Sequence, residues 1–310
     1  IGMNRILSVI MVCSMVLWGG SWVSGKLAAV SVDPFVIIFW RFTLTTLSLF
    51  PLVPVFKQKL WPGWAGLRWL IAASSTLFIY NICFFTGLQT GFAGAGGLLV
   101  TSLNPLLTFL LTFAIQRSKI SRLQALGLAI GLFGGLVMLD LPHHGLEELL
   151  KGGNLLFLAA SLLWAILTML SSRAQETVPF ISYSIWVYGL TALLALFVSL
   201  ISGSIWTTPI RSLPFWFNML YLSVGATSFA TTVYFLCTKR LGSRRASAFV
   251  FTVPVSALFF SWLFLGELPS VFALSGGALA IGAVFTINRA HSGTVSREGP
   301  QGVPENEEIA

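Results

Sequence analysis

One arginine lies within an otherwise apolar stretch and is the strongest candidate for a binding group. Arg41 follows Pro34 by seven residues, in a run where a charge would be costly inside a bilayer. Such a residue usually faces a cavity or a partner, and its guanidinium could hold the carboxylate or phosphate of a solute. The alternative is a structural arginine that donates to helix-end carbonyls or extends outward to the interface.

Two tryptophans four residues apart form a second candidate group. Trp18 and Trp22 enclose Gly19, Gly20 and Ser21, and this spacing puts both indoles on one face of a helix. Indoles and a hydroxyl can contact a flat or cationic solute, so we expect Trp18, Ser21 and Trp22 in a binding site. Glycines permit close helix approach or a kink, so Gly19 and Gly20 are candidate hinges. Ordinary packing is the alternative.

Polar and aromatic side chains in the other apolar runs complete the predicted solute site. They are Tyr80, Asn81, Asn104, Trp164 and Tyr234. Buried amides and hydroxyls need hydrogen-bond partners, and contacts between helices would satisfy them equally well. Pro105 and Pro254 each interrupt the backbone hydrogen bonds of an apolar run, so we expect them to act as hinges near the site.

The composition around these residues excludes a water-soluble fold. Of 310 residues, 56% are hydrophobic and 9% are charged, against roughly 25% charged in an ordinary soluble domain. This excludes soluble enzymes, disordered scaffolds and secreted disulfide modules. The sequence contains no His-Glu-x-x-His motif and no Walker loop, and its three histidines lie outside the apolar runs. It therefore predicts no enzyme, no metal site and no cofactor.

Ten apolar stretches are long enough to cross a bilayer, which takes ~20 helical residues. They are 6–26, 34–56, 67–90, 93–115, 121–141, 152–172, 179–202, 213–238, 244–265 and 270–288. The sequence thus predicts an all-α membrane protein with ten transmembrane helices. The residues from Ser292 to Ala310 are rich in Gly, Pro and Glu and show no apolar periodicity. Residues 289–310 are therefore predicted to be a disordered cytoplasmic tail.

The distribution of positive charge predicts the orientation in the membrane. With the N-terminus in the cytoplasm, 14 Lys and Arg residues fall on the cytoplasmic side and three on the other. This asymmetry predicts that both termini are cytoplasmic, and it explains the net charge of +8 without a nucleic-acid partner. Lys26 closes the first span near the outer face, as an interface lysine or as a second cavity residue.

The two halves of the chain resemble each other weakly. A shift of 149 residues places Pro105 on Pro254 and Gly127 on Gly276, while Trp18 and Trp164 both lie in the first helix of their half. The loops 116–122 and 239–245 are basic, whereas the loops at the equivalent positions of the other half, 266–269 and 90–93, contain no basic residue. Five helices per half put equivalent loops on opposite sides of the membrane, which explains this exchange of charge. The chain therefore predicts two inverted five-helix repeats, 6–141 and 152–288, an arrangement common in alternating-access carriers.

A stripe of small residues marks the fifth predicted helix. Gly127, Gly131 and Gly135 recur every four residues, which favours close helix packing. The packing partner is either another helix of the same chain or a second copy. The protein is accordingly expected to be a monomer or a homodimer.

Several motifs together resemble a known transporter family. They are Leu17-Trp18-Gly19-Gly20-Ser21-Trp22, Lys26, Pro34 and Arg41-Phe42 in the first half, and Lys239-Arg240-Leu241-Gly242, Arg245-Ala246, Pro254-Val255, Leu265-Gly266-Glu267 and Gly276-Gly277 in the second. Over about 6–288 the chain resembles the EamA family of the drug/metabolite transporter superfamily. The resemblance implies a ten-helix carrier with a central cavity, typically an inner-membrane exporter. Gln116-Arg117-Ser118 replaces a common Gly-Glu, which leaves Glu267 without an equivalent acid.

The favoured function is a secondary transporter in the bacterial inner membrane that exports amino acids or related amphipathic metabolites. Its partners would be a small-molecule solute and the lipid bilayer. A carrier for nucleotide sugars, sugar phosphates or cationic drugs remains an alternative, and an intramembrane cation without a matching carboxylate disfavours the last of these. An integral-membrane lipid-processing enzyme or a channel is a further alternative.

Overall fold

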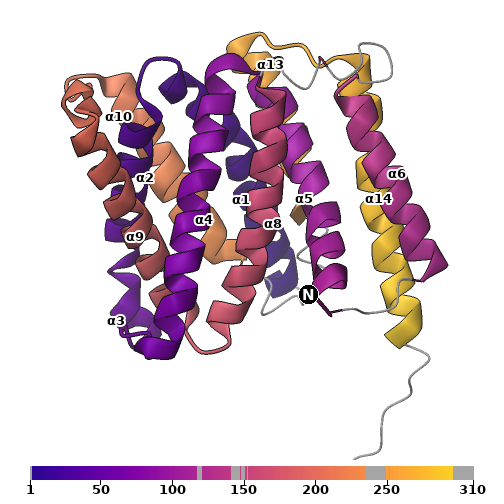
Figure 1. Cartoon of the computed structure of the whole chain (residues 1–310), viewed down its shortest axis with the longest axis horizontal. Coiled ribbons are helices and arrows are strands. Elements are labelled where there is room, and N and C mark those ends of the chain that lie inside the picture. Colours follow the sequence, from indigo (N-terminus) through magenta and orange to yellow (C-terminus); the bar gives the residue numbers. More distant parts are fainter. Residues whose placement is uncertain are drawn as a thin grey trace, which may run out of the picture.

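The computed structural model describes residues 2–116, 121–140, 147, 151, 153–234, 249–250 and 252–295. These residues form helices and turns, with no strand in the described ranges. Helices satisfy their own backbone hydrogen bonds, which is what a chain of long apolar runs requires within a bilayer. Figure 1 shows the helices standing side by side.

The first half supplies five long helical segments. They are α1 (Gly2–Ala29), α2 (Pro34–Leu49) with its short continuation α3 (Leu52–Phe56), α4 (Gly63–Thr90), α5 (Ala93–Gln116) and α6 (Arg122–Met138). The second half repeats the order with α8 (Asn154–Gln175), α9 (Phe180–Ile201), α10 (Leu213–Leu220) continued by η3 (Tyr221–Phe229), α13 (Thr252–Leu265) and α14 (Val271–Val295). A 3-10 turn, η2 (Ser204–Thr207), follows α9.

The part of the chain that the structure describes therefore contains ten apolar helical segments, as the sequence predicts. The helices α1, α4, α5, α8 and α9 have the length and hydropathy of membrane spans, while α2, α6, α13 and α14 are shorter apolar helices. The chain is a multi-pass helical membrane protein.

Local chemistry sets the helix ends. Asp33 caps α2 by accepting a hydrogen bond from the Phe35 backbone N–H at 2.9 Å, and Pro34 occupies the first turn. The predicted span 34–56 is broken between α2 and α3, because Pro51 has no N–H to continue the helix. Ser121 and Gln124 form a reciprocal capping box at the start of α6.

The eighth predicted span departs from a regular helix. After α10, the nine residues of η3 form a π-helix, in which backbone hydrogen bonds reach five residues back. Helix α14 also continues to Val295, seven residues beyond the predicted boundary at 288. Loop residues 117–120 and 239–245, on which part of the predicted orientation depends, and residues 296–310 lie outside the described residues.

Three pairs of equivalent helices from the two halves pack against each other. Figure 1 shows α6 beside α14 at one end of the molecule and α2 beside α9 toward the other. Between them α5 packs on α13, and α1 contacts α13 much as α8 contacts α5. Each of these contacts is reproduced when the first half is exchanged for the second, which is the packing that an inverted repeat produces.

The glycines between α6 and α14 show this symmetry at single residues. A Cβ added to Gly131 would lie 3.0 Å from the Ala283 Cβ, and one added to Gly134 would lie 3.0 Å from the Ala280 backbone nitrogen. The 149-residue shift converts the first pair into the second. The glycine stripe thus packs within the chain, and the fold consists of two inverted five-helix repeats.

Candidate functional site

The guanidinium of Arg41 joins the two halves of the chain. From α2, its Nη1 donates to Oδ1 of Asn81 on α4 at 3.2 Å, and its Nη2 donates to Oγ1 of Thr227 on η3 at 3.3 Å. The Nε atom is buried and has no hydrogen-bond partner. Both acceptors are neutral, so among the described residues no carboxylate balances the charge. Donors remain available to an anionic ligand.

Aromatic rings surround this cation. The Arg41 Cζ atom lies 5.3 Å from the ring centroid of Phe42, 6.0 Å from that of Phe84 and 5.8 Å from that of Phe85. Such rings offer weak attraction to a cation. They also exclude water, and a Coulomb interaction with a bound anion is stronger where water is excluded.

The two acceptors of Arg41 are fixed by their own helices. Asn81 is fully buried and its Nδ2 donates to the Leu77 carbonyl at 2.8 Å, which leaves Oδ1 directed at the guanidinium. Thr227 donates from Oγ1 to the Leu222 carbonyl at 2.7 Å, five residues back along the π-helix. Each acceptor is therefore oriented before any solute binds.

The repeat relates these groups to one another. The shift of 146 residues that aligns Trp18 with Trp164 also aligns Asn81 with Thr227. The Trp18 Nε1 donates to the Ala226 carbonyl at 2.7 Å, and the Trp164 ring lies 4.9 Å from the Tyr80 ring, at the equivalent position of the other half. Arg41 thus lies between a symmetry-related amide and hydroxyl.

Several of the predicted site residues are brought together around α4. Tyr80 and Asn81 are neighbours there, and the ring of Trp164 lies against Tyr80. The Trp22 ring is 4.7 Å from Phe84, which is itself one of the rings around Arg41. Trp22 is only 4% exposed, so in this conformation it is a packed side chain.

Other predicted site residues make contacts away from the guanidinium. Tyr234 lies 5.5 Å from the Trp18 ring. Ser21 donates to the Trp18 carbonyl at 2.6 Å, and Asn104 accepts from Thr108 at 3.1 Å, each within its own helix. A role for these residues in solute binding stays a prediction.

The predicted hinges lie within continuous helices. Helix α1 is unbroken, and side chains of α13 and η3 occupy the space beside its glycines: Ser256 at Gly19 and Tyr221 at Gly20. Pro105 lies inside α5, and Pro254 is buried near the start of α13. Movement at these four positions stays a prediction.

Charged residues hold the corner between α4 and α5. Lys26 donates from Nζ to the Gly91 carbonyl at 2.8 Å. Glu267, which follows α13, accepts from the Gly94 backbone N–H at 3.1 Å and from the Ser261 hydroxyl, so it caps the start of α5 from the opposite repeat. Within the described ranges, no three His, Cys, Asp or Glu side chains are grouped to hold a metal ion.

Thr227 is the site residue that the sequence analysis missed. Threonine is common in apolar helices, where it usually bonds to its own backbone. The repeat contained a usable signal, because the shift that pairs Trp18 with Trp164 places Thr227 opposite Asn81. The role of Glu267 as a cap was missed too, since it depends on a contact between the repeats.

Comparisons with known proteins agree with this architecture. The EamA-like transporter family matches residues 6–139 and 151–289. An uncharacterized transporter of Archaeoglobus fulgidus is 24% identical over 91% of this chain and 97% of its own. The uncharacterized transporter YoaV of Bacillus subtilis is 25% identical over 87% of this chain and 92% of its own.

A solved crystal structure shares the fold. It superposes with a TM-score of 0.61 at 19% identity and covers 94% of this chain and 99% of its own. The matched family spans both repeats, and the relatives are named as transporters. The protein is thus a membrane transporter and not an enzyme, and it belongs to the EamA-like transporter family.

Proposed function

We propose that this transporter exports amino acids or related amphipathic metabolites by alternating access, with Arg41 binding the anionic group of the solute. The observation that carries the proposal is the buried, unpartnered Nε of a guanidinium held between the two repeats. A carboxylate has two oxygens and fits the planar set of donors that an arginine presents.

The surroundings of Arg41 suit an amphipathic solute. Tyr80, Phe84 and Trp164 form adjoining aromatic contacts next to the anion-binding group, where an apolar side chain of the solute could pack. A sugar phosphate or nucleotide sugar is the second candidate, because its phosphate would use the same unpaired donors. A cationic drug is disfavoured by the positive charge of the site.

Counterflow in proteoliposomes tests the proposal. Purified protein would be reconstituted with unlabelled amino acid inside, and uptake of the labelled amino acid, its uncharged amide and a sugar phosphate would be compared. We expect saturable uptake that internal solute stimulates, and preference for the carboxylate over the amide. Uptake that does not saturate and is not stimulated would indicate a channel and contradict the proposal.

Substitution of Arg41 tests the assigned group. Arg41→Gln should weaken apparent affinity for the carboxylate solute by about 10- to 100-fold, since a hydrogen bond to a charged group contributes ~1.5–3 kcal/mol. Arg41→Lys keeps the charge but loses the planar set of donors, so its apparent affinity should lie between those of the wild type and Arg41→Gln. Arg173→Gln, at an exposed residue paired with Glu176, is the control. If folded Arg41→Gln binds the carboxylate solute with wild-type affinity, Arg41 has a structural role and does not bind the solute.

We also propose the bacterial inner membrane as the location, with both termini in the cytoplasm. The charge asymmetry of the loops supports this orientation. On a cysteine-free background, an impermeant thiol reagent added to intact cells should label Leu268→Cys and spare Lys59→Cys. The reverse pattern would overturn the orientation.

A further inference from the structure

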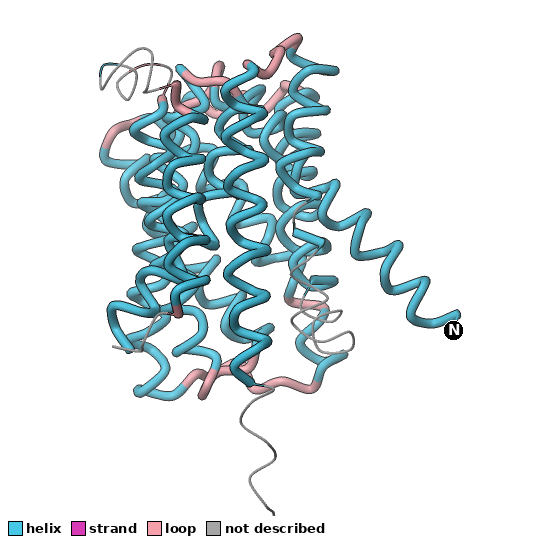
Figure 2. Tube along the Cα trace, turned by 90° about the vertical axis from the view of Figure 1, so that its right-hand side faces the viewer, coloured by secondary structure: helices cyan, strands magenta, loops and turns pink. Residues whose placement is uncertain are grey.

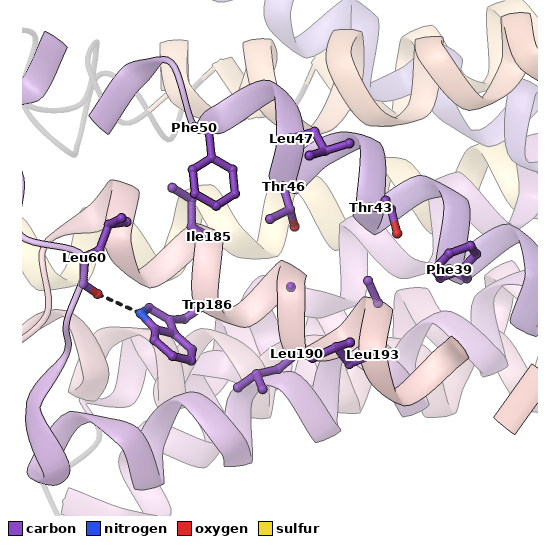
Figure 3. A pocket seen from close by; sticks show the side chains of 12 residues that line it. Phe39, Thr43, Thr46, Leu47, Phe50, Leu60, Ile185, Trp186, Leu190 and Leu193 are labelled. Atoms are coloured by element: carbon purple, nitrogen blue, oxygen red, sulfur yellow. Dashed lines mark hydrogen bonds between the residues drawn. The ribbon is translucent and has the colours of Figure 1, made fainter. Parts of the chain in front are cut away.

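An apolar groove of about 500 Å³ opens between α2 and α9 (Figure 3). Phe39, Leu47 and Phe50 line it from α2, and Ile185, Trp186 and Leu193 line it from α9. Leu47 and Leu193 are about 60% exposed, so the groove lies on the surface that the bundle presents to lipid. None of the residues predicted to bind the solute lines it, so it is separate from the Arg41 site.

A glycine leaves the groove open. A Cβ added to Gly189 would approach only Thr46 across the groove, at 3.8 Å, which is an ordinary contact distance. A larger side chain at this position would therefore extend into the groove without first disturbing the packing of α2 on α9.

One end of the groove is formed by the chain segment between α3 and α4. Leu60 lines the groove, and its carbonyl accepts a hydrogen bond from the Trp186 Nε1 at 2.7 Å, the bond drawn in Figure 3. Gln58 accepts from the Ile181 backbone N–H at 3.0 Å. These contacts hold residues 57–60 against the first turns of α9.

This attachment places positive charge at the end of the groove. Lys57 and Lys59 flank Gln58, and both side chains are exposed. Neither forms an ion pair with a residue that the structure describes. Two lysines without an ion-pair partner among the described residues therefore lie on the segment that forms one end of the groove.

Tryptophans at the same end indicate the depth of this region in the membrane. The ring of Trp61 lies 5.6 Å from that of Trp64 and 6.2 Å from that of Trp186. Trp64 is 79% exposed. Exposed tryptophans gather at the level of lipid headgroups, so the groove runs from that level into the hydrocarbon region.

We propose that this groove binds an anionic phospholipid, with one acyl chain between α2 and α9 and the headgroup phosphate on Lys57 and Lys59. The apolar walls match an acyl chain, and the lysines match a negative headgroup at the level where the tryptophans place it. Since α2 and α9 are equivalent helices of the two repeats, the bound lipid contacts both.

Native mass spectrometry of the purified protein tests the headgroup preference. Phosphatidylglycerol and phosphatidylcholine with identical chains would be titrated separately, and bound lipid would be counted. We expect preferential retention of phosphatidylglycerol. In Lys57→Gln/Lys59→Gln the affinity for phosphatidylglycerol should fall by roughly tenfold or more, because each basic residue near the headgroup contributes to the attraction. Arg211→Gln, which removes a positive charge outside this region, is the matched control and should bind like the wild type.

Two further measurements place the acyl chain. Gly189→Leu should lower retention of both lipids, since the side chain fills the groove. Phosphatidylglycerol with brominated chains should quench tryptophan fluorescence more than brominated phosphatidylcholine, and Gly189→Leu should reduce this difference because its side chain fills the groove. The proposal is overturned if the lysine double variant retains phosphatidylglycerol as the wild type does, or if the quenching difference is unchanged in Gly189→Leu.

Discussion

Arg41 depends on two hydrogen-bond acceptors that come from different repeats, and Thr227 is the one that a single substitution removes most cleanly. Thr227→Val keeps the side-chain shape but loses the acceptor for Nη2 and the bond to the Leu222 carbonyl. We expect apparent solute affinity to fall about three- to tenfold and unfolding free energy to fall by ~0.5–1.5 kcal/mol. Concentration-dependent uptake and thermal unfolding in detergent measure these effects.

A double-mutant cycle separates the positioning of Arg41 from a general loss of stability. If Thr227 acts through Arg41, its effect on affinity should largely disappear in an Arg41→Gln background, because interacting residues are not additive. Thr231→Val, one turn further along the same helix, is the control and should leave affinity unchanged. Full additivity of Thr227→Val with Arg41→Gln would show that Thr227 has no positioning role.

Among single residues, the sequence predicts the charged and amide groups of the candidate site better than its hydroxyl groups. Arg41 and Asn81 could be predicted because a guanidinium and an amide are conspicuous in apolar runs. Their contact with each other could not, since it depends on how α2 packs against α4. Thr227 is inconspicuous by type, and its orientation depends on the local π-helical geometry.

Among the elements, α5 begins at a cap supplied by the other repeat. Glu267 accepts from the Gly94 N–H, so its charge lies at the positive end of the helix dipole. Glu267→Gln should lower unfolding free energy by ~0.3–1 kcal/mol through loss of that charge, and Glu267→Ala should cost ~0.5–2 kcal/mol through loss of the cap. Thermal unfolding checks this order. Glu176→Gln, which removes one partner of an exposed ion pair, should change stability little.

The close contact between α6 and α14 depends on Gly134, which is next to the predicted glycine stripe on the same helix. A Cβ added to Gly134 would lie 2.8 Å from the Gly276 carbonyl oxygen, so Gly134→Val must push the helices apart. We expect a loss of ~1–3 kcal/mol, typical of overpacking, in thermal unfolding. Gly282→Val is the matched control, because a Cβ there meets nothing within 4 Å. Equal stability of the two variants would mean that α6 and α14 are not packed as described.

The helices could be predicted from the sequence, because a long apolar stretch within a bilayer must satisfy its own backbone hydrogen bonds. Apolar length predicts the ten spans, and Pro51 explains the one that divides. The π-helix of η3 could not be predicted in this way. Its backbone pattern is accompanied by tertiary contacts, such as the Trp18 indole on the Ala226 carbonyl and the Ser48 hydroxyl on Ser228, which the sequence does not specify.

For the whole molecule, the inverted repeat places the Arg41 site where the two halves meet. The amide and the hydroxyl that hold the guanidinium come from α4 and its repeat equivalent. A rocking movement of one repeat against the other would change their distance from Arg41 and therefore the donors that a solute can reach. Under the proposed mechanism, solute binding at Arg41 would be coupled in this way to exposure of the site on one side of the membrane.

The distribution of acids in the whole chain predicts transport without an obligatory proton. Proton-coupled carriers commonly place a titratable group along the path. In the part of the chain that the structure describes, the carboxylates of Asp33, Asp140, Glu147, Glu176 and Glu267 all lie at helix ends or between helices. We therefore expect facilitated transport that follows the solute gradient.

Sealed proteoliposomes containing a pH-sensitive dye provide the measurement. Addition of a solute gradient should drive solute flux with no accompanying change in internal pH, and a protonophore should leave the initial rate unaltered. A stoichiometric, solute-dependent pH change would contradict uncoupled transport. Glu267→Gln would then be the first variant to examine, because Glu267 is the described carboxylate that accepts a hydrogen bond from the other repeat, at the start of α5.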